Sequence, residues 1–346
     1  MFAAAFLALD SSVALAADED TDKDAGTITW ALTPYDGEDT DHRVSLRHEI
    51  DPGSTVSDKI ILTNYSDRAA AFDVYASDGL ISESGDFDLL PPGEEPADGG
   101  SWIALGDIEE GTLKDGVISV ELDAEESVVI PLSIAVPENA TPGDHPAGVV
   151  AQYVPEDDGA VRFASRVGVR AHLRVTGDVV ATIEPKISDI EYVPSWNPFV
   201  PATLRVSYAL ENIGNVRLGS EATTQISGPF GLLEQESSEA TREVLPGQQT
   251  TATAEFSFWP LFHTSGEIDA QPVVVGEDEI SQPKAASTSI SAWTVPWSQL
   301  ALLVIIAGVI VLIIVMRGRG KKRMEQRIAE AVAKAQGGTE SADQAS

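Results

Sequence analysis

The chain has 346 residues, no cysteine, and 22 Lys and Arg residues against 55 Asp and Glu residues, a formal net charge of −33. Such a charge repels phosphate backbones, which excludes nucleic-acid binding through clustered basic side chains. The lack of cysteine excludes disulfide scaffolds, thiolate metal sites and cysteine nucleophiles. With 43% hydrophobic residues, the chain can form about two globular domains with real cores.

The N-terminus carries a short apolar run, residues 2–9, and then the small residues Ala14 and Ala16. Their small-x-small spacing is typical of a signal-peptidase site, so we expect a signal peptide over residues 1–16. No Lys or Arg precedes the run, and Asp10 interrupts the stretch between the run and the cleavage site. We therefore expect this signal peptide to be truncated at its start.

An acidic linker, residues 17–26, is followed by short segments of alternating polarity that are separated by Pro, Gly, Asn and Asp. Alternation with a period of two over such short segments predicts strands with one buried face. The expected strands include Thr27–Leu32, Val44–Ile50, Val117–Leu122, Val128–Val136, Gly148–Val154, Arg162–Val167 and His172–Val180. No amphipathic helix is predicted before residue 297.

A weak internal sequence repeat suggests how these strands are divided between domains. Asp58–Val74 reads DKIILTNYSDRAAAFDV, and Thr203–Leu218 reads TLRVSYALENIGNVRL. Each copy predicts a strand that ends in Asn, a tight turn and a return strand, the hairpin of an immunoglobulin-like sandwich. We therefore predict an all-β exterior of two tandem immunoglobulin-like β-sandwich domains, residues 27–180 and 181–292.

Two segments interrupt the regular spacing of the strands. Leu89–Ser101 is rich in Pro, Gly and acidic residues, which predicts a surface loop. Pro137–Gly148 carries two turn signals and is expected to connect two late strands of the first sandwich.

Trp297–Met316 is a run of 20 residues without a formal charge. At about 30 Å it matches the hydrocarbon core of a bilayer and predicts a transmembrane helix. Aromatic and basic residues flank this run, namely Trp293, Trp297, Arg317, Arg319, Lys321, Lys322 and Arg323. Because the basic residues follow the apolar run, the positive-inside rule places the C-terminus in the cytoplasm. We therefore predict a single-pass, type I protein of the cell membrane with extracellular N-terminal domains.

The predicted exterior carries fifteen basic and fifty acidic residues, a net charge of −35. Its lack of cysteine fits the surface of a Gram-positive bacterium, which has one membrane. The basic cytoplasmic tail, residues 317–346, repeats Met324, Ile328 and Val332 at helical spacing before Gly337. This pattern predicts a short helix that rests on anionic lipid or, alternatively, binds a partner.

Residues that could carry chemistry are few. The five histidines lack metal-ligand spacing, and no nucleotide-binding or nucleophile motif occurs, so we predict no metal, no cofactor and no enzymatic activity. Trp30 and Trp102 follow the apolar pattern of core residues. The candidate binding residues are the aromatics of the Pro-bounded segments in the second sandwich, Trp196, Trp259 and Phe262.

The segments DPGSTVSDKIILTNYSDRAAAFDVYASDG, GSWIAL, VPENATPGDHPAGVVA and RVGVRAHLRVTG occur in this order between residues 27 and 180. They resemble the peptidoglycan-binding domain of WxL-interacting surface proteins, in its actinobacterial form. The following stretch, YVPSWNPFVPATLRVSYALENIGNVRL, is similar to the second domain that accompanies it. The resemblance implies tandem immunoglobulin-like domains, a membrane helix, and association with peptidoglycan and surface partner proteins.

We therefore expect a non-enzymatic adhesion or scaffold protein of the cell surface that binds peptidoglycan, partner proteins or both. Two other functions stay open. One is an envelope-assembly factor or cell-surface hydrolase whose site the sequence does not reveal. The other is a single-pass sensor that acts through the tail.

Overall fold

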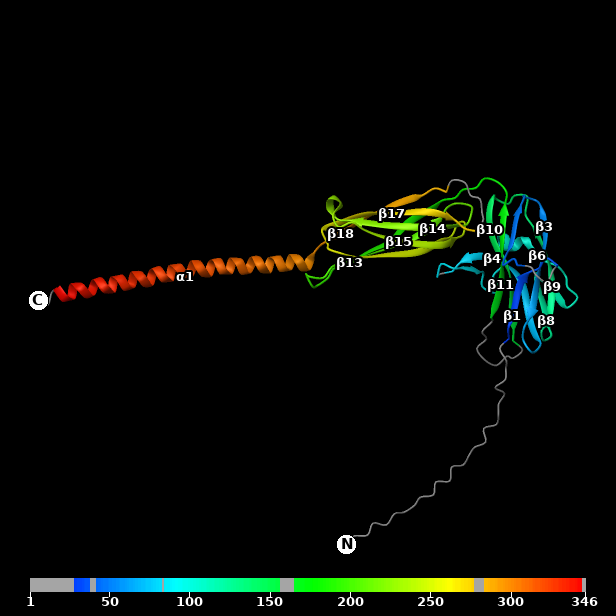
Figure 1. The fold of residues 1–346 in the computed structure, drawn as a ribbon, viewed down its shortest axis with the longest axis horizontal. Helices are drawn as coiled ribbons and strands as arrows, with labels where there is room; N and C mark the ends of the chain where they lie inside the picture. Colours follow the sequence, from blue (N-terminus) through cyan, green and yellow to red (C-terminus); the bar gives the residue numbers. More distant parts are fainter. Residues whose placement is uncertain (1–27, 38–41, 83, 156–164, 277–282, 344–346) are drawn as a thin grey trace, which may run out of the picture.

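The computed structural model describes residues 28–37, 42–82, 84–155, 165–276 and 283–343 (Figure 1). The predicted signal peptide, with Ala14 and Ala16, and the acidic linker lie outside these residues. Figure 1 shows two bodies built from strands, and a long helix that leaves the second body. The fold of the described residues is thus mainly β-sandwich with one C-terminal apolar helix.

The strands before residue 176 form two sheets that we call the N-terminal sandwich. One sheet has the order β1-β3-β9-β6, and the other has the order β2-β11-β10-β4-β8-β7 with β5 paired to β4. All neighbours are antiparallel except β2 and β11, which are parallel. The bounds are β1 Trp30–Pro34, β2 Leu46–Ile50, β3 Thr55–Asn64, β4 Ala70–Ile81, β5 Phe87–Leu89, 3₁₀ helix η1 Gly99–Trp102, β6 Ile103–Leu105, β7 Gly111–Lys114, β8 Val117–Leu122, β9 Ser127–Ala135, β10 Gly143–Val154 and β11 Arg166–Val175.

The core of this sandwich follows the predicted alternation. Ile60 and Leu62 of β3 are fully buried against residues of the opposite sheet such as Phe72 and Val74 of β4. Trp30 lies at the edge of this core, where its Nε1 donates to the Ala151 carbonyl at 3.2 Å. Alternation works here because each sheet has only one face in contact with the other sheet.

The remaining strands form the C-terminal sandwich, whose sheets have the orders β12-β13-β16 and β15-β14-β17-β18. A second hydrophobic cluster, from Ala181 to Ile290, lies between them. The bounds are β12 Ile183–Val193, β13 Ala202–Asn212, β14 Leu218–Ser227, 3₁₀ helix η2 Pro229–Gly231, β15 Gln235–Val244, β16 Gln249–Phe258, β17 Phe262–Val274, β18 Ala286–Thr294 and helix α1 Trp297–Asp343.

A buried asparagine ends β3. The Nδ2 group of Asn64 donates to the carbonyls of Arg68, Leu122 and Asp123 at 2.9, 3.2 and 3.0 Å. Its Oδ1 accepts the backbone N–H of Ser66 at 3.0 Å. Asn64 is 0% exposed, so these bonds satisfy backbone groups that water does not reach.

Asn212 ends β13 in the same way. Its Nδ2 donates to the carbonyls of Val216 and Val244 at 2.7 and 2.9 Å, and its Oδ1 accepts the N–H of Gly214 at 3.0 Å. Like Asn64, it is 0% exposed. The internal sequence repeat therefore corresponds to a repeated structure. In each copy a buried Asn at the end of a strand bonds backbone groups of the following turn and of another strand, and we call this feature the asparagine corner.

The predicted hairpins are wrong. β3 and β4 lie in different sheets, as do β13 and β14, so each corner carries the chain across its sandwich. The reason is physical: the Asn amide bonds the carbonyls inside the turn and those of a third strand, whereas a hairpin would pair the two strands with each other. A tight turn in sequence does not reveal which sheet the next strand joins.

Several predicted strand boundaries also change: the strand predicted at Thr27–Leu32 is β1, Trp30–Pro34, and the one predicted at Val44–Ile50 is β2, which begins at Leu46. The strands predicted at Arg162–Val167 and His172–Val180 are one strand, β11, which pairs with β10 from Arg166 to Val175. In addition, β10 starts at Gly143, so the second half of the predicted Pro137–Gly148 connection is strand. Pro146 is accommodated because the ladder with β4 begins only at Ala147.

The predicted short tail helix is not separate. α1 is one continuous helix from Trp297 to Asp343, and Gly337 does not end it. An interior glycine destabilises a helix by only about 1 kcal/mol relative to alanine, and a long helix propagates more easily than a new one nucleates. α1 is long and apolar enough to cross a membrane, and none of its apolar span is buried by the protein.

Polar groups join the two sandwiches. The Asp144 carboxylate of the N-terminal sandwich accepts a hydrogen bond from the Arg217 backbone N–H of the C-terminal sandwich at 2.7 Å. Within its own sandwich it also accepts two from the Arg174 guanidinium, at 2.6 and 2.9 Å. The Asp144 N–H donates to the Asn215 carbonyl at 2.7 Å. Glu243 pairs with Arg170 at 2.8 Å. Charged side chains of both sandwiches thus meet in a contact where each has a partner.

Candidate binding site

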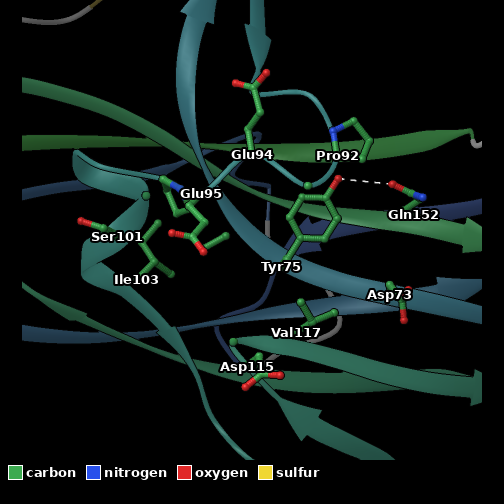
Figure 2. Close-up of a pocket in the computed structure, with 15 residues that line it drawn as sticks. Asp73, Tyr75, Pro92, Glu94, Glu95, Ser101, Ile103, Asp115, Val117 and Gln152 are labelled. Carbon is green, nitrogen blue, oxygen red and sulfur yellow. Dashed lines mark hydrogen bonds between the residues drawn. The ribbon is translucent and has the colours of Figure 1, made fainter.

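A pocket of about 430 Å³ lies on the N-terminal sandwich (Figure 2). Its floor is the outer face of β4, β8 and β10, and one wall is the loop at residues 92–96. The lining residues are Asp73, Tyr75, Ala76, Pro92, Gly93, Glu94, Glu95, Pro96, Gly100, Ser101, Ile103, Asp115, Gly116, Val117 and Gln152. A volume in this range suits a small ligand or a few units of a polymer.

The floor follows from strand alternation. Phe72 and Val74 of β4 point into the core, so the intervening Asp73 and the next residue, Tyr75, face outward. Figure 2 shows Tyr75 in the middle of the pocket, with its hydroxyl directed toward Gln152. That hydroxyl donates to Gln152 Oε1 at 3.3 Å. The half-buried ring of Tyr75 is thus held by a partner on the neighbouring strand β10, 77 residues farther along the chain.

The wall is clamped at both ends. Asp78 accepts the N–H groups of Ala97, Asp98 and Gly100 at 2.6, 2.9 and 2.6 Å. At the other end, Arg166 donates to the Leu90 carbonyl at 2.6 Å. The predicted surface loop therefore has fixed ends.

One glycine is required for this clamp. A Cβ on Gly100 would lie 2.4 Å from the carbonyl carbon of Ser77, closer than side-chain atoms can approach. Any other residue at this position would push η1 away from β4 and open the wall of the pocket.

His145 supports the wall from behind. Its Nδ1 lies 2.6 Å from Asp98 Oδ1 and its Nε2 lies 2.9 Å from the Thr141 carbonyl, while its ring contacts that of Trp102 in a tilted arrangement, with 4.4 Å between the ring centroids. Because both neighbours are acceptors, both ring nitrogens must donate, which favours the imidazolium form. Burial lowers the pKa of His145, but these hydrogen bonds outweigh it and raise the pKa above 6.5.

All charged side chains that line the pocket are acidic. Four carboxylates line it, from Asp73, Glu94, Glu95 and Asp115, and no Lys, Arg or His is among the lining residues. Asp73 accepts a hydrogen bond from Ser119 at 2.6 Å. Within the described ranges, no group of three or more His, Asp or Glu side chains could hold a metal ion. The pocket therefore suits ligands that offer hydroxyl, amide or amino groups.

The residues predicted from sequence lie elsewhere. Trp196, Trp259 and Phe262 are 91%, 44% and 51% exposed, all on the C-terminal sandwich. They do not line the pocket. The flanking residues of the predicted membrane span are exposed as well, with Trp293 and Trp297 at 76% and 61% and with Arg317, Arg319, Lys321, Lys322 and Arg323 along α1.

Sequence reasoning missed Tyr75 and Gln152. The alternation of β4 already places Tyr75 on the outer face, and an outward aromatic residue close to a Pro-rich loop was the available signal. No signal in the sequence pointed to Gln152, because its role depends on β10 lying next to β4.

No protein-family model and no curated protein matches the chain. Solved structures that it resembles include the class 5 fimbriae chaperone CfaA, at 11% identity and a TM-score of 0.33 over 77% of this chain and 100% of that chain. A chaperone–tip adhesin complex of CFA/I fimbriae matches at 10% identity and 0.35, over 78% and 99%. The E. coli chaperone DraB matches at 10% identity and 0.30, over 77% and 98%. Likeness at this level assigns no function to the chain.

Proposed function

We propose that the chain is a non-enzymatic, membrane-anchored protein of the cell surface that binds wall peptidoglycan. In this proposal α1 crosses the membrane as a single pass, with its basic end in the cytoplasm. The two sandwiches are tandem immunoglobulin-like domains on the outside, and the pocket around Tyr75 holds part of the glycan. The resemblance of residues 27–180 to WxL-interacting surface proteins supports this ligand.

The observation that carries the proposal is the chemistry of the pocket. The pocket is one concave surface that contains a half-buried tyrosine ring, the Gln152 amide and several carboxylates. No basic side chain lines it. Aromatic faces stack on sugar rings, and amide and carboxylate oxygens accept bonds from hydroxyl and N-acetyl N–H groups. Phosphate-rich wall polymers would be repelled by the same carboxylates. The pocket therefore favours an N-acetylated glycan over an anionic polymer.

The test is sedimentation of the full chain, in lipid nanodiscs, with insoluble peptidoglycan sacculi at physiological and at high salt. We expect retention that resists salt, because the proposed contacts are stacking and neutral hydrogen bonds. Tyr75→Ala should reduce retention at least about tenfold, the effect of roughly 1.4 kcal/mol of lost stacking. Tyr75→Phe, which loses only the bond to Gln152, should reduce it less.

Tyr65→Ala is the matched control, since Tyr65 is 62% exposed on the same sandwich and does not line the pocket. Equal loss of retention in Tyr65→Ala and Tyr75→Ala would contradict the role of the pocket. Absence of retention in the parent protein would contradict peptidoglycan as the ligand. Release of soluble muropeptides from the sacculi would contradict the non-enzymatic part and favour a hydrolase.

A further inference from the structure

The end of the C-terminal sandwich from which α1 leaves is formed by three loops. These join β12 to β13, β14 to β15 and β16 to β17, at residues 194–201, 228–234 and 259–261. Strand register places them together: Val193 pairs with Thr203, Ile226 with Gln235, and Phe262 with Thr294 at the end of β18. Figure 1 shows α1 continuing away from this end of the sandwich. We call this surface the apolar end.

Large apolar side chains of all three loops are exposed there. The six that define the surface are Trp196, Phe199, Phe230, Leu232, Trp259 and Phe262, with exposed fractions of 91%, 77%, 103%, 55%, 44% and 51%. Apart from Glu234, the three loops contain no charged residue. An apolar surface of this extent on a protein with a net charge of −33 indicates a binding surface.

The backbone is strained so as to present these residues. Among the described residues, five non-glycine residues have a positive φ, and three of them are apolar side chains of this end: Phe230 at 62°, Leu233 at 56° and Phe262 at 69°. Bulky residues disfavour this conformation, which glycine or asparagine would adopt easily. A strained backbone that holds apolar side chains in water costs free energy. A partner that removes these side chains from water offsets that cost.

The loops are also ordered before any partner arrives. Asn197 Oδ1 accepts the Phe199 N–H at 3.0 Å, and the Gly228 N–H donates to the Leu232 carbonyl at 2.7 Å. The side chain of Gln299, in the first turn of α1, reaches the Pro198 carbonyl at 3.5 Å. The apolar end is therefore coupled to the base of the helix.

We propose that the apolar end sits in the interfacial layer of the same bilayer that α1 crosses. The inference rests on the membrane anchoring in the proposed function, and not on the peptidoglycan ligand. Only Val295 and Pro296 separate β18 from α1, so these loops lie next to the point where the helix enters lipid. Tryptophan and phenylalanine without nearby charges are the side chains that the interface favours. A bilayer thus covers a surface that would otherwise stay exposed.

The natural absence of cysteine makes the test direct, because any introduced cysteine is the only one in the full chain. The variants are Phe230→Cys and Phe199→Cys at the apolar end, Tyr65→Cys on the N-terminal sandwich as the aqueous control, and Ile306→Cys in α1 as the lipid control. Each is labelled with an environment-sensitive fluorophore, and the chain is reconstituted in vesicles with and without brominated lipid.

We expect blue-shifted emission and quenching by brominated lipid at Phe230→Cys and Phe199→Cys, strong quenching at Ile306→Cys, and none at Tyr65→Cys. Water-like emission at the two loop labels with a quenched Ile306→Cys label would overturn the proposal and leave the anchor intact. Blue-shifted loop labels that brominated lipid does not quench would also overturn it, since a protein surface would then be the cover. An unquenched Ile306→Cys label would show instead that the anchoring itself is wrong.

Discussion

The N-terminal and C-terminal sandwiches use the same asparagine corner but differ in their other loops. In the first, a loop is clamped by Asp78 and Arg166 and bounds a polar, acidic pocket. In the second, the loops at the α1 end are aromatic and contain Glu234 as their one charged residue. The shared corner fixes how the chain crosses between sheets, which leaves the loops free to differ in chemistry. The comparison teaches that the loops set the chemical difference between the two sandwiches, while strand residues such as Tyr75 and Gln152 form the floor of the pocket.

The largest effect is expected from breaking the corners. Asn64→Ala and Asn212→Ala leave buried carbonyls without donors, and each should lower the free energy of unfolding by about 2–4 kcal/mol. Asn64→Ala should be the more damaging, because Asn64 bonds three carbonyls and Asn212 bonds two. Urea unfolding of the full chain in detergent, with hydrogen exchange of each sandwich, measures both.

Thr251→Ala is the control for the corners, since Thr251 lies exposed on β16 and should change stability by less than about 0.5 kcal/mol. If either corner variant matched this control, the two corners would not be equivalent supports of their sandwiches.

A smaller effect is expected at the contact between the sandwiches. Asp144→Asn removes the charge from the acceptor of the Arg217 backbone N–H, the bond by which this side chain reaches the C-terminal sandwich, so it should destabilise the contact by about 1–3 kcal/mol. It also weakens the bidentate pair with Arg174 within the N-terminal sandwich. Hydrogen exchange should rise near Asp144 and Asn215 while both cores stay protected. Glu191→Gln, which alters the exposed pair with Arg205, serves as the control and should change nothing measurable. Faster exchange in both cores of Asp144→Asn would mean that the sandwiches do not fold separately.

The smallest effect concerns pH. Burial lowers the pKa of His145, but the hydrogen bonds to Asp98 and to the Thr141 carbonyl raise it above its ordinary value of 6.5, so the folded state binds this proton more tightly than the unfolded state does. The stabilisation is therefore complete below pH 6.5 and is lost as the pH rises through the folded pKa. Unfolding titrations should show this loss in the parent protein and not in His145→Gln. An unchanged profile in His145→Gln would refute this role for His145.

Much of the fold could be predicted from alternation alone. The strand predicted at Val117–Leu122 is β8, and the one predicted at Val128–Val136 differs from β9 by one residue at each end. The sheet assignment at Asn64 could not be predicted, because the same Asn-turn pattern fits a hairpin and a crossing between sheets. The extent of β11 was missed because its pairing with β10, a distant contact, decides it.

The site was less predictable than the fold. The pocket combines Tyr75 of β4 with Gln152 of β10, and only the pairing of these strands brings them together. The aromatic residues that the sequence did single out are exposed, but on the other sandwich. The type and local pattern of a residue can identify an exposed aromatic side chain. They do not reveal a concave surface that is assembled from segments far apart in the sequence.

The junction between β18 and α1 has a mechanical consequence. Two residues connect the strand to the helix, and the Tyr192 hydroxyl donates to the carbonyl of one of them, Val295, at 2.9 Å. A long flexible stalk would let a binding head sweep through a wide volume, but so short a connection does not. Under the proposed anchoring, this short connection would hold the pocket within a narrow range of heights above the bilayer, so only ligands in that range would be within reach.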